Sequence, residues 1–301
     1  MINDAHRRQR TGIVLASLGA VCWGLAGPIA QKLFYQGYSP EWLTGLKMTI
    51  SGLLILSVLW VKDRKNMFTI WKNKKDALLL LIFSVVGMSS VQYMYFATVK
   101  ASNSPTATIM QSLGTIIIVL WGIVAHREMP RVVDVLSVVL ALAGTWLLVT
   151  KGHLSHLAIS PLALGLGILL GTCGAINTLM PNNLLERYSS LSVVGWSMLT
   201  GGIFLEFIHP VWRDVPKITG MNLLGIITII IFGTALAYLC FLGSLNYINP
   251  TVAGLLDAFE PLTATILSVI FLHMFFNFWE ILGGILVLST VFILSWAKPK
   301  D

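Results

Sequence analysis

Residues 89–96, SSVQYMYF, and residues 234–241, TALAYLCF, match one another, and this match decides how the chain is organised. The alignment brings together polar and aromatic positions: Ser89 with Thr234, Tyr93 with Tyr238 and Phe96 with Phe241. Nearly the same shift pairs residues on both sides of this stretch: Cys22 with Cys173, Leu33 with Leu184, Ser39 with Ser190, Pro105 with Pro250, Asp134 with Glu280, Leu136 with Leu282 and Leu140 with Leu286. Matches in one order and with nearly one shift indicate an internal duplication. Residues 1–150 and 158–301 are therefore predicted to be two copies of one unit.

Each copy consists of apolar runs that are long enough to cross a bilayer. Of the 301 residues, 56% are hydrophobic and 11% are charged, whereas a soluble domain carries roughly 25% charged residues. The runs are continuous rather than alternating, which favours helices over the strands of a barrel. About 20 apolar residues span the hydrocarbon core. The expected fold is an all-α integral membrane protein with ten transmembrane helices, at residues 11–33, 41–61, 77–99, 105–125, 131–150, 162–184, 191–209, 221–245, 250–272 and 279–297.

Four of these helices are expected to begin at a polar residue followed by proline. The polar side chain can accept a free backbone N–H of the first turn, and proline tolerates the first helical position because its missing N–H needs no partner there. The four pairs are Ser39-Pro40, Ser104-Pro105, Ser160-Pro161 and Asn249-Pro250.

The two copies are expected to be inverted relative to one another. Five spans are an odd number, so the second copy enters the membrane from the opposite side, which is the architecture of many secondary transporters. Lys and Arg favour cytoplasmic loops. With the N-terminus inside, fourteen of them fall in inner segments and five in outer loops or at their margins, while Lys47 lies within a span. Both termini are therefore predicted to be cytoplasmic, and the first apolar run to be a retained helix rather than a cleaved signal peptide.

The ninth span contains two acidic residues, Asp257 and Glu260, in the run LDAFEPLTATI. Three residues apart, they share one helical face. A carboxylate in mid-membrane costs about 2.5 to 3.5 kcal/mol on translocon scales, so such groups usually mark an ion, proton or substrate path. We expect this pair to bind a cationic group or to carry a proton. The alternative is that one of them only accepts hydrogen bonds from neighbouring helices and braces a kink at Pro261.

Lys47 is the basic residue placed well inside a span, about six residues from its outer end. It can contact a substrate carboxylate, or its long stem can carry the ammonium group to the outer interface at little cost. The second interpretation is slightly favoured. If Lys47 and Asp257 face one cavity, a zwitterion such as an amino acid is the natural ligand.

Proline and glycine interrupt corresponding helices of the two copies, the first at Gly24 and Pro28 and the sixth at Gly174 and Pro181. In inverted-repeat carriers such interruptions lie near the solute site. Proline frees the carbonyl four residues earlier, so we expect kinks with free carbonyls near Gly24 and Asn177. Functional kinks and mere packing kinks are equally compatible with this pattern.

Aromatic and amide side chains at mid-span complete the expected binding wall. An unpaired amide facing lipid is costly, so each should face other helices, where it either contacts the solute or only links helices through hydrogen bonds. Symmetry predicts that the two tyrosines share a wall. These residues are Trp23, Gln92, Tyr93, Gln111, Asn177 and Tyr238.

Other classes of protein fit poorly. The sequence has no GxxxxGKS or GxGxxG motif, which argues against an ATP-driven pump. Three cysteines lack metal spacing, and His153-x-x-His156 has no third ligand nearby, so neither cofactor nor metal is expected. The net charge of +7 reports topology rather than a nucleic-acid partner. Asp134 and Glu280 lie in first helical turns, where a carboxylate is favoured by the helix dipole.

With these features the sequence resembles the drug/metabolite transporter superfamily, EamA type. The resemblance rests on the ten-helix length, the two repeats and a few loose motifs: Cys22-Trp23-Gly24, Lys47, Glu128 followed by Gly144, and Glu260-Pro261. The acid that would correspond to Glu128 in the second repeat is missing at Met274.

The resemblance implies a basket of helices around a central cavity, and solutes such as amino acids, other metabolites or drugs, often exported. We therefore expect a secondary carrier or facilitator in the plasma membrane of a bacterial cell, most simply an amino acid exporter and not an enzyme. A drug efflux protein or an uptake permease is the alternative. The expected partners are a small solute, the lipid bilayer and protons as coupling ions, in a monomer or homodimer.

Overall fold

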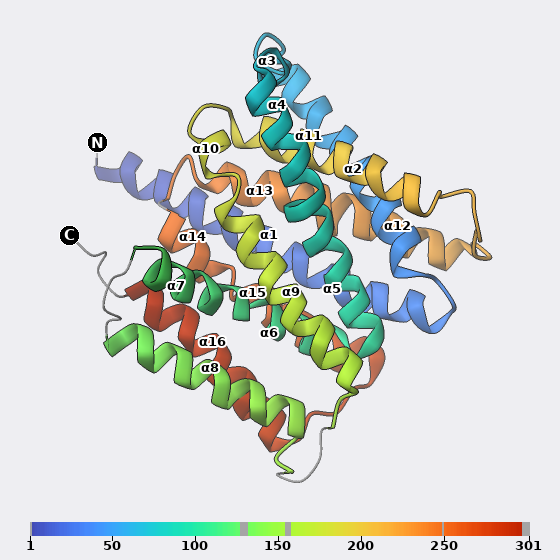
Figure 1. The fold of residues 1–301 in the computed structure, drawn as a ribbon, viewed down its shortest axis with the longest axis vertical. Coiled ribbons are helices and arrows are strands. Elements are labelled where there is room, and N and C mark those ends of the chain that lie inside the picture. Colours follow the sequence, from blue (N-terminus) through green and yellow to red (C-terminus); the bar gives the residue numbers. More distant parts are fainter. Residues whose placement is uncertain (1, 127–131, 154–157, 249, 297–301) are drawn as a thin grey trace.

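The computed structural model describes residues 2–126, 132–153, 158–248 and 250–296. All regular secondary structure in these ranges is helical. The elements, shown in Figure 1, are α1 (Ile2–Tyr35), α2 (Pro40–Asp63), α3 (Thr69–Lys72), α4 (Lys74–Ile82), η1 (Phe83–Ser89), α5 (Ser90–Ala101), α6 (Ser104–Gln111), α7 (Leu113–His126), α8 (Val132–Thr150), α9 (Pro161–Leu179), α10 (Asn182–Leu185), α11 (Ser190–Ile208), α12 (Gly220–Ile230), η2 (Ile231–Leu236), α13 (Ala237–Ser244), α14 (Pro250–Leu256), α15 (Phe259–Leu272) and α16 (Phe278–Trp296).

The expected all-α membrane fold is confirmed. Within the described ranges, nine helical stretches are long and apolar enough to cross a membrane, and α16 supplies a shorter tenth apolar helix. Each expected span coincides with one helix or with two or three consecutive ones, and the ends agree within three residues, except that α1 begins at Ile2 rather than at residue 11.

Two of the four expected helix starts are confirmed by hydrogen bonds. Ser39 and Ser160 cap α2 and α9 through their side-chain oxygens. The expectation for Ser104 is wrong, because Asn103 caps α6: its carboxamide oxygen accepts the N–H of the residue three positions on, at 2.9 Å. Asn249 lies outside the described residues, as does Glu128.

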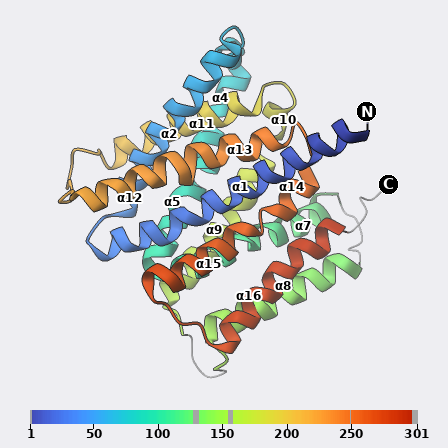
Figure 2. The same ribbon diagram turned by 180° about the vertical axis from the view of Figure 1, so that it is seen from behind.

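Consecutive spans run antiparallel, so the bundle has two ends. The start of α1 and the end of α16 lie at the same end, which we call the N-face (Figures 1 and 2). The loop with α3 and the loop with α10 also lie there, while the connections α1–α2, α5–α6 and α11–α12 lie at the opposite face (Figure 1).

The third and eighth spans each contain a π-helical segment, η1 and η2. In η1, the Ser89 hydroxyl donates to the carbonyl of Ser84, five residues earlier, at 2.7 Å. In η2, the Thr234 hydroxyl donates to the carbonyl of Ile229, again five residues earlier, at 2.9 Å. Such segments are rare and concentrate at functional sites. The aligned Ser89 and Thr234 therefore share one unusual local structure.

The fourth and ninth spans are both interrupted near their middle. The fourth breaks at Ser112, between α6 and α7, and the ninth at Asp257 and Ala258, between α14 and α15. The shift of 145 that pairs Pro105 with Pro250 also pairs Ser112 with Asp257. Pro261 removes the N–H that would bond the Asp257 carbonyl, which accepts the Glu260 N–H at 2.9 Å instead.

The prolines of the first and sixth spans act differently from one another. Pro28 lies inside an uninterrupted α1, where its missing N–H leaves the Gly24 carbonyl without that partner. In the sixth span, α9 ends at Leu179 and Pro181 precedes the short α10, so the helix is interrupted at the proline where a kink was expected.

α1 runs through the middle of the bundle, α2 packs on α11, and α8 and α16 form a separate pair at one edge (Figures 1 and 2). Gly144 and Gly283 allow that pair to approach closely. A Cβ on either glycine would lie 2.6 Å from the carbonyl oxygen of the other, so a larger residue at either position would push the helices apart.

Candidate functional site

Lys47 lies in the interior of the bundle. Its side chain is 3% exposed, its Nζ donates to Gln92 Oε1 at 2.9 Å, and the same atom lies 3.9 Å from the centre of the Phe96 ring. The expectation that Lys47 reaches to the interface is therefore wrong. Gln92 and Phe96 are four residues apart and lie on one face of α5, so this face offers the ammonium group an amide oxygen and an aromatic ring.

Gln92 connects Lys47 to the second half of the chain. Its Nε2 donates a long hydrogen bond of 3.4 Å to the Tyr238 hydroxyl on α13. The Tyr238 ring packs edge-on against Trp23 of α1, with ring centres 4.9 Å apart and an interplanar angle of 82°. The hydroxyl also lies 3.8 Å from the sulfur of Met88. Three of the predicted site residues, Gln92, Tyr238 and Trp23, thus form one group with Lys47.

Glu260 reaches the same group from the break in the ninth span. It is 9% exposed, and its carboxyl group lies near enough to Lys47, Asp257 and Tyr238 for electrostatic interaction with each of them. Its backbone packs on α1: a Cβ at Gly24 would lie 2.6 Å from the Glu260 carbonyl oxygen. Glycine at position 24 therefore allows α1 to approach the break.

The opposite charges of this group are not bridged. Across the described ranges, neither Lys47 nor Glu260 forms an ion pair within 4.0 Å. Buried charges are normally paired and hydrogen-bonded. The arrangement therefore leaves a cation and a carboxylate able to bind the two ends of a dipolar molecule.

Asp257 supplies a second carboxylate beside Tyr238 and Glu260. Its Oδ1 is buried and has no hydrogen-bond partner among the described residues, and the same holds for Asn177 Oδ1 on α9. A buried acceptor without a donor costs about 1 to 3 kcal/mol, and such groups in native structures call for an explanation. A donor-rich ligand group, such as an ammonium, would satisfy the acceptor of Asp257.

Tyr93 and Tyr238 belong to different hydrogen-bonded groups, and the wall that symmetry predicts for them stays a prediction. The Tyr93 hydroxyl donates to Glu41 Oε1 at 2.8 Å, near the start of α2. The aligned tyrosines differ because helix α2 brings an acid to Tyr93, whereas α5 brings Gln92 to Tyr238.

Gln111 lies beside the break in the fourth span. Its carbonyl oxygen lies 3.8 Å from the position of a Cβ at Gly174, on α9. The sixth span thus passes the break in the fourth span just as α1 passes the break in the ninth. Within the described structure, neither Gln111 nor Asn177 forms a side-chain hydrogen bond with the group around Lys47.

Two residues of this region, Phe96 and Glu41, were not predicted from the sequence to belong to the site. Phe96 was part of the repeat match and lies four residues after Gln92, which is the spacing of neighbours on one helix face. Glu41 follows Pro40 in a first helical turn, where an acid is ordinary, so the sequence offered no signal for its bond to Tyr93.

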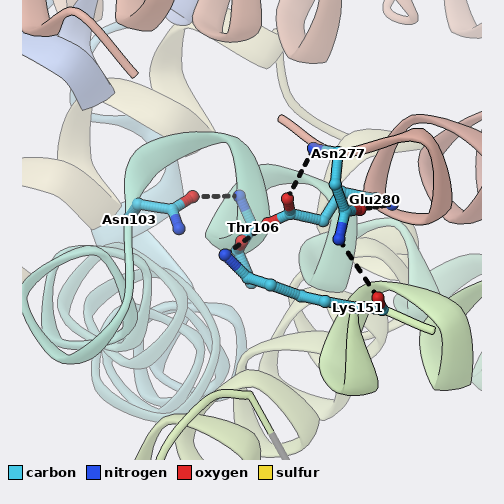
Figure 3. A network of polar contacts seen from close by, with 5 residues as sticks. All are labelled: Asn103, Thr106, Lys151, Asn277 and Glu280. Carbon is cyan, nitrogen blue, oxygen red and sulfur yellow. Dashed lines mark hydrogen bonds and ion pairs between the residues drawn. The ribbon is translucent and has the colours of Figure 1, made fainter. Parts of the chain in front are cut away.

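Glu280 has the structural role expected for an acid in a first helical turn, in a polar network at the face opposite the N-face (Figure 3). The Asn277 side chain accepts the Glu280 N–H at 2.8 Å, and the Glu280 carboxylate accepts the Asn277 N–H at 2.9 Å, a reciprocal cap of α16. Glu280 also pairs with Lys151 at 2.8 Å. Of the expected histidine pair, His156 lies outside the described residues, and those described contain no cluster of metal-binding side chains.

A buried charge links the two halves at the N-face. Asp76, 5% exposed, accepts from Arg187 at 2.9 Å and from the Tyr188 hydroxyl at 2.8 Å. Partial burial and this hydrogen bond raise the pKa of Tyr188, which keeps the phenol a proton donor. The contact holds the loop after α10 to the start of α4.

Known proteins resemble this chain in sequence and in fold. The chain matches the model of the EamA-like transporter family over residues 10–150 and 161–296. It is 36% identical over 287 residues to an uncharacterized inner membrane transporter, YicL, of Salmonella typhimurium, with 95% of each chain covered. It is 23% identical over 286 residues to the threonine/homoserine exporter RhtA of the same species, covering 94% of this chain and 88% of the relative. A crystal structure of a protein 17% identical to the chain has the same fold, with a TM-score of 0.61 and 97% and 96% of the chains covered.

Proposed function

The chain belongs to the EamA-like transporter family and is a multi-pass membrane transporter of small molecules, and from this premise we propose that it exports amino acids or closely related metabolites from a bacterial cell. Support for the solute class comes first from the name of one relative, a threonine/homoserine exporter. At 23% identity that name alone does not carry the proposal.

The observation that carries it is the unbridged set of charges in the bundle. Lys47 is held by an amide and a ring, while Glu260 and Asp257 approach from the broken ninth span without pairing with it. An amino acid has a carboxylate for Lys47 and an ammonium for the acids. Trp23 and Tyr238 would face the rest of the solute.

The transport cycle that we propose is alternating access by two inverted repeats, residues 1–150 and 158–301. The paired π-helical segments and the paired breaks support this division. The charge distribution in the loops supports a topology with both termini in the cytoplasm. In such carriers, broken helices of the two repeats surround the solute.

Asp257 and Glu260 are also the groups that would couple transport to protons. Two neighbouring buried carboxylates rarely keep both charges, so a proton can replace the solute ammonium in the empty carrier. A carrier without this step would work as a facilitator.

The test is flux in proteoliposomes with a panel of labelled amino acids, nucleosides, amines and carboxylates, with and without a pH gradient. We expect flux of one or more amino acids and none of the nucleosides. Flux confined to amines or to nucleosides would contradict the amino acid assignment, and amino acid flux that ignores the gradient would identify a facilitator.

A further inference from the structure

Phe96 gives Lys47 a neutral partner in the middle of the membrane protein. The ring is fully buried, with 0% exposure, and its centre lies 3.9 Å from the Lys47 ammonium. The face of an aromatic ring carries a partial negative charge and attracts cations, most strongly where water is excluded. The second partner, Gln92 Oε1, is neutral as well.

Neutral partners matter for a binding site. A carboxylate in ion-pair contact with Lys47 would compete with the carboxylate of a solute, whereas an amide oxygen and a ring carry no net negative charge and do not replace it. An ammonium group has three N–H donors; one is directed at Gln92, so donors remain for a ligand.

The position of Phe96 is fixed by packing that does not involve the solute. Phe34 of α1 packs edge-on against it, with ring centres 5.6 Å apart and an interplanar angle of 77°. Both rings belong to one buried apolar cluster. Phe34 contacts Phe96 but is not the ring that faces Lys47, which makes it a matched control for the loss of aromatic character in the same cluster.

We propose that Phe96 is a positioning residue, whose ring holds the Lys47 ammonium aimed at the carboxylate of the solute. This inference rests on the proposed function and adds the residue that sets carboxylate recognition. It predicts that the electron density of the Phe96 ring, and not only its volume, controls affinity for solutes with a carboxylate.

The test replaces Phe96 by phenylalanines with one, two and three ring fluorines, which weaken the cation attraction stepwise while changing the volume little. The same three replacements are made at Phe34. For each protein in liposomes, we measure KM for labelled L-threonine and the inhibition constant of L-threoninol, which keeps the amine and lacks the carboxylate.

At Phe96 we expect the KM of L-threonine to rise with each fluorine, to about tenfold for the trifluoro ring. The maximal rate and the inhibition constant of L-threoninol should stay unchanged, because only the carboxylate contact weakens. The Phe34 series should be flat. A flat Phe96 series, or equal changes for both compounds, would overturn the inference while leaving the proposed function intact. Absence of L-threonine flux in the wild-type protein would overturn the proposed function for this solute and the inference with it.

Discussion

The breaks in the fourth and ninth spans occupy matching positions but differ in chemistry. The fourth breaks at Ser112 and the ninth at Asp257, followed by Glu260. At the first break the sixth span passes with Gly171 and, at a greater distance, Gly174, and at the second α1 passes with Gly24. The backbone interruption is therefore present twice, whereas the charge is present once. From this difference we propose that the duplication supplies the frame for alternating access and that the second break determines which solute is carried.

The largest effect expected from this comparison is that of Glu260→Gln. The change removes a charge with little change in shape. Losing a charge-assisted contact of about 3 kcal/mol corresponds to a loss of roughly 100-fold in amino acid flux. Efflux from proteoliposomes measures it. The control is Glu280→Gln, which weakens a cap and an ion pair far from Lys47 and should leave flux per folded molecule unchanged. Wild-type flux in Glu260→Gln would show that the charge at the second break is not used.

Lys47→Met should reduce amino acid flux by about 30-fold, because the apolar stem is kept while a charged contact of about 2 kcal/mol is lost. Inhibition by an amine without a carboxylate should remain. Lys32→Met, a change at an exposed residue in the last turn of α1, serves as the control. If Lys47→Met weakened amino acid flux and inhibition by the amine equally, Lys47 would only support the fold.

Alanine at Gly24 and at Gly174 should affect stability differently. At Gly24 a Cβ would lie 2.6 Å from the Glu260 carbonyl oxygen and 2.6 Å from Thr263 Cβ, so we expect about 2 kcal/mol of destabilisation from overpacking. At Gly174 the nearest atom lies at 3.8 Å, so alanine should be neutral or stabilise by up to about 1 kcal/mol, because it is the better helix former. Thermal unfolding in detergent compares the two. Equal shifts in Tm would contradict the close approach at the second break.

The smallest effect is expected for Ser112→Ala. The Ser112 hydroxyl makes one long hydrogen bond of 3.4 Å to the Thr108 carbonyl, so both stability and flux should change little, within about 0.5 kcal/mol and twofold. A large loss of flux would show that the neutral break also binds solute.

The spans could be predicted from the sequence, and so could the placement of Glu260 inside one of them, because hydropathy acts locally along the chain. Prediction failed where a partner comes from another helix. Lys47 turns inward because α5 offers Gln92 and Phe96, and Tyr93 turns to Glu41 of α2. Ser112, where the fourth span breaks, is neither proline nor glycine, so no local sequence pattern predicted this break.

The central claim, that a solute carboxylate binds Lys47 between the two halves, is tested most directly by solid-state NMR. Protein with ¹⁵N-labelled lysine side chains is saturated with L-threonine labelled with ¹³C at the carboxyl carbon, and the dipolar coupling between the two labels is measured. We expect a coupling that corresponds to about 4 Å, the reach of a charge-assisted hydrogen bond, and its loss in Lys47→Gln. A wild-type protein that transports L-threonine without such a coupling would contradict the claim.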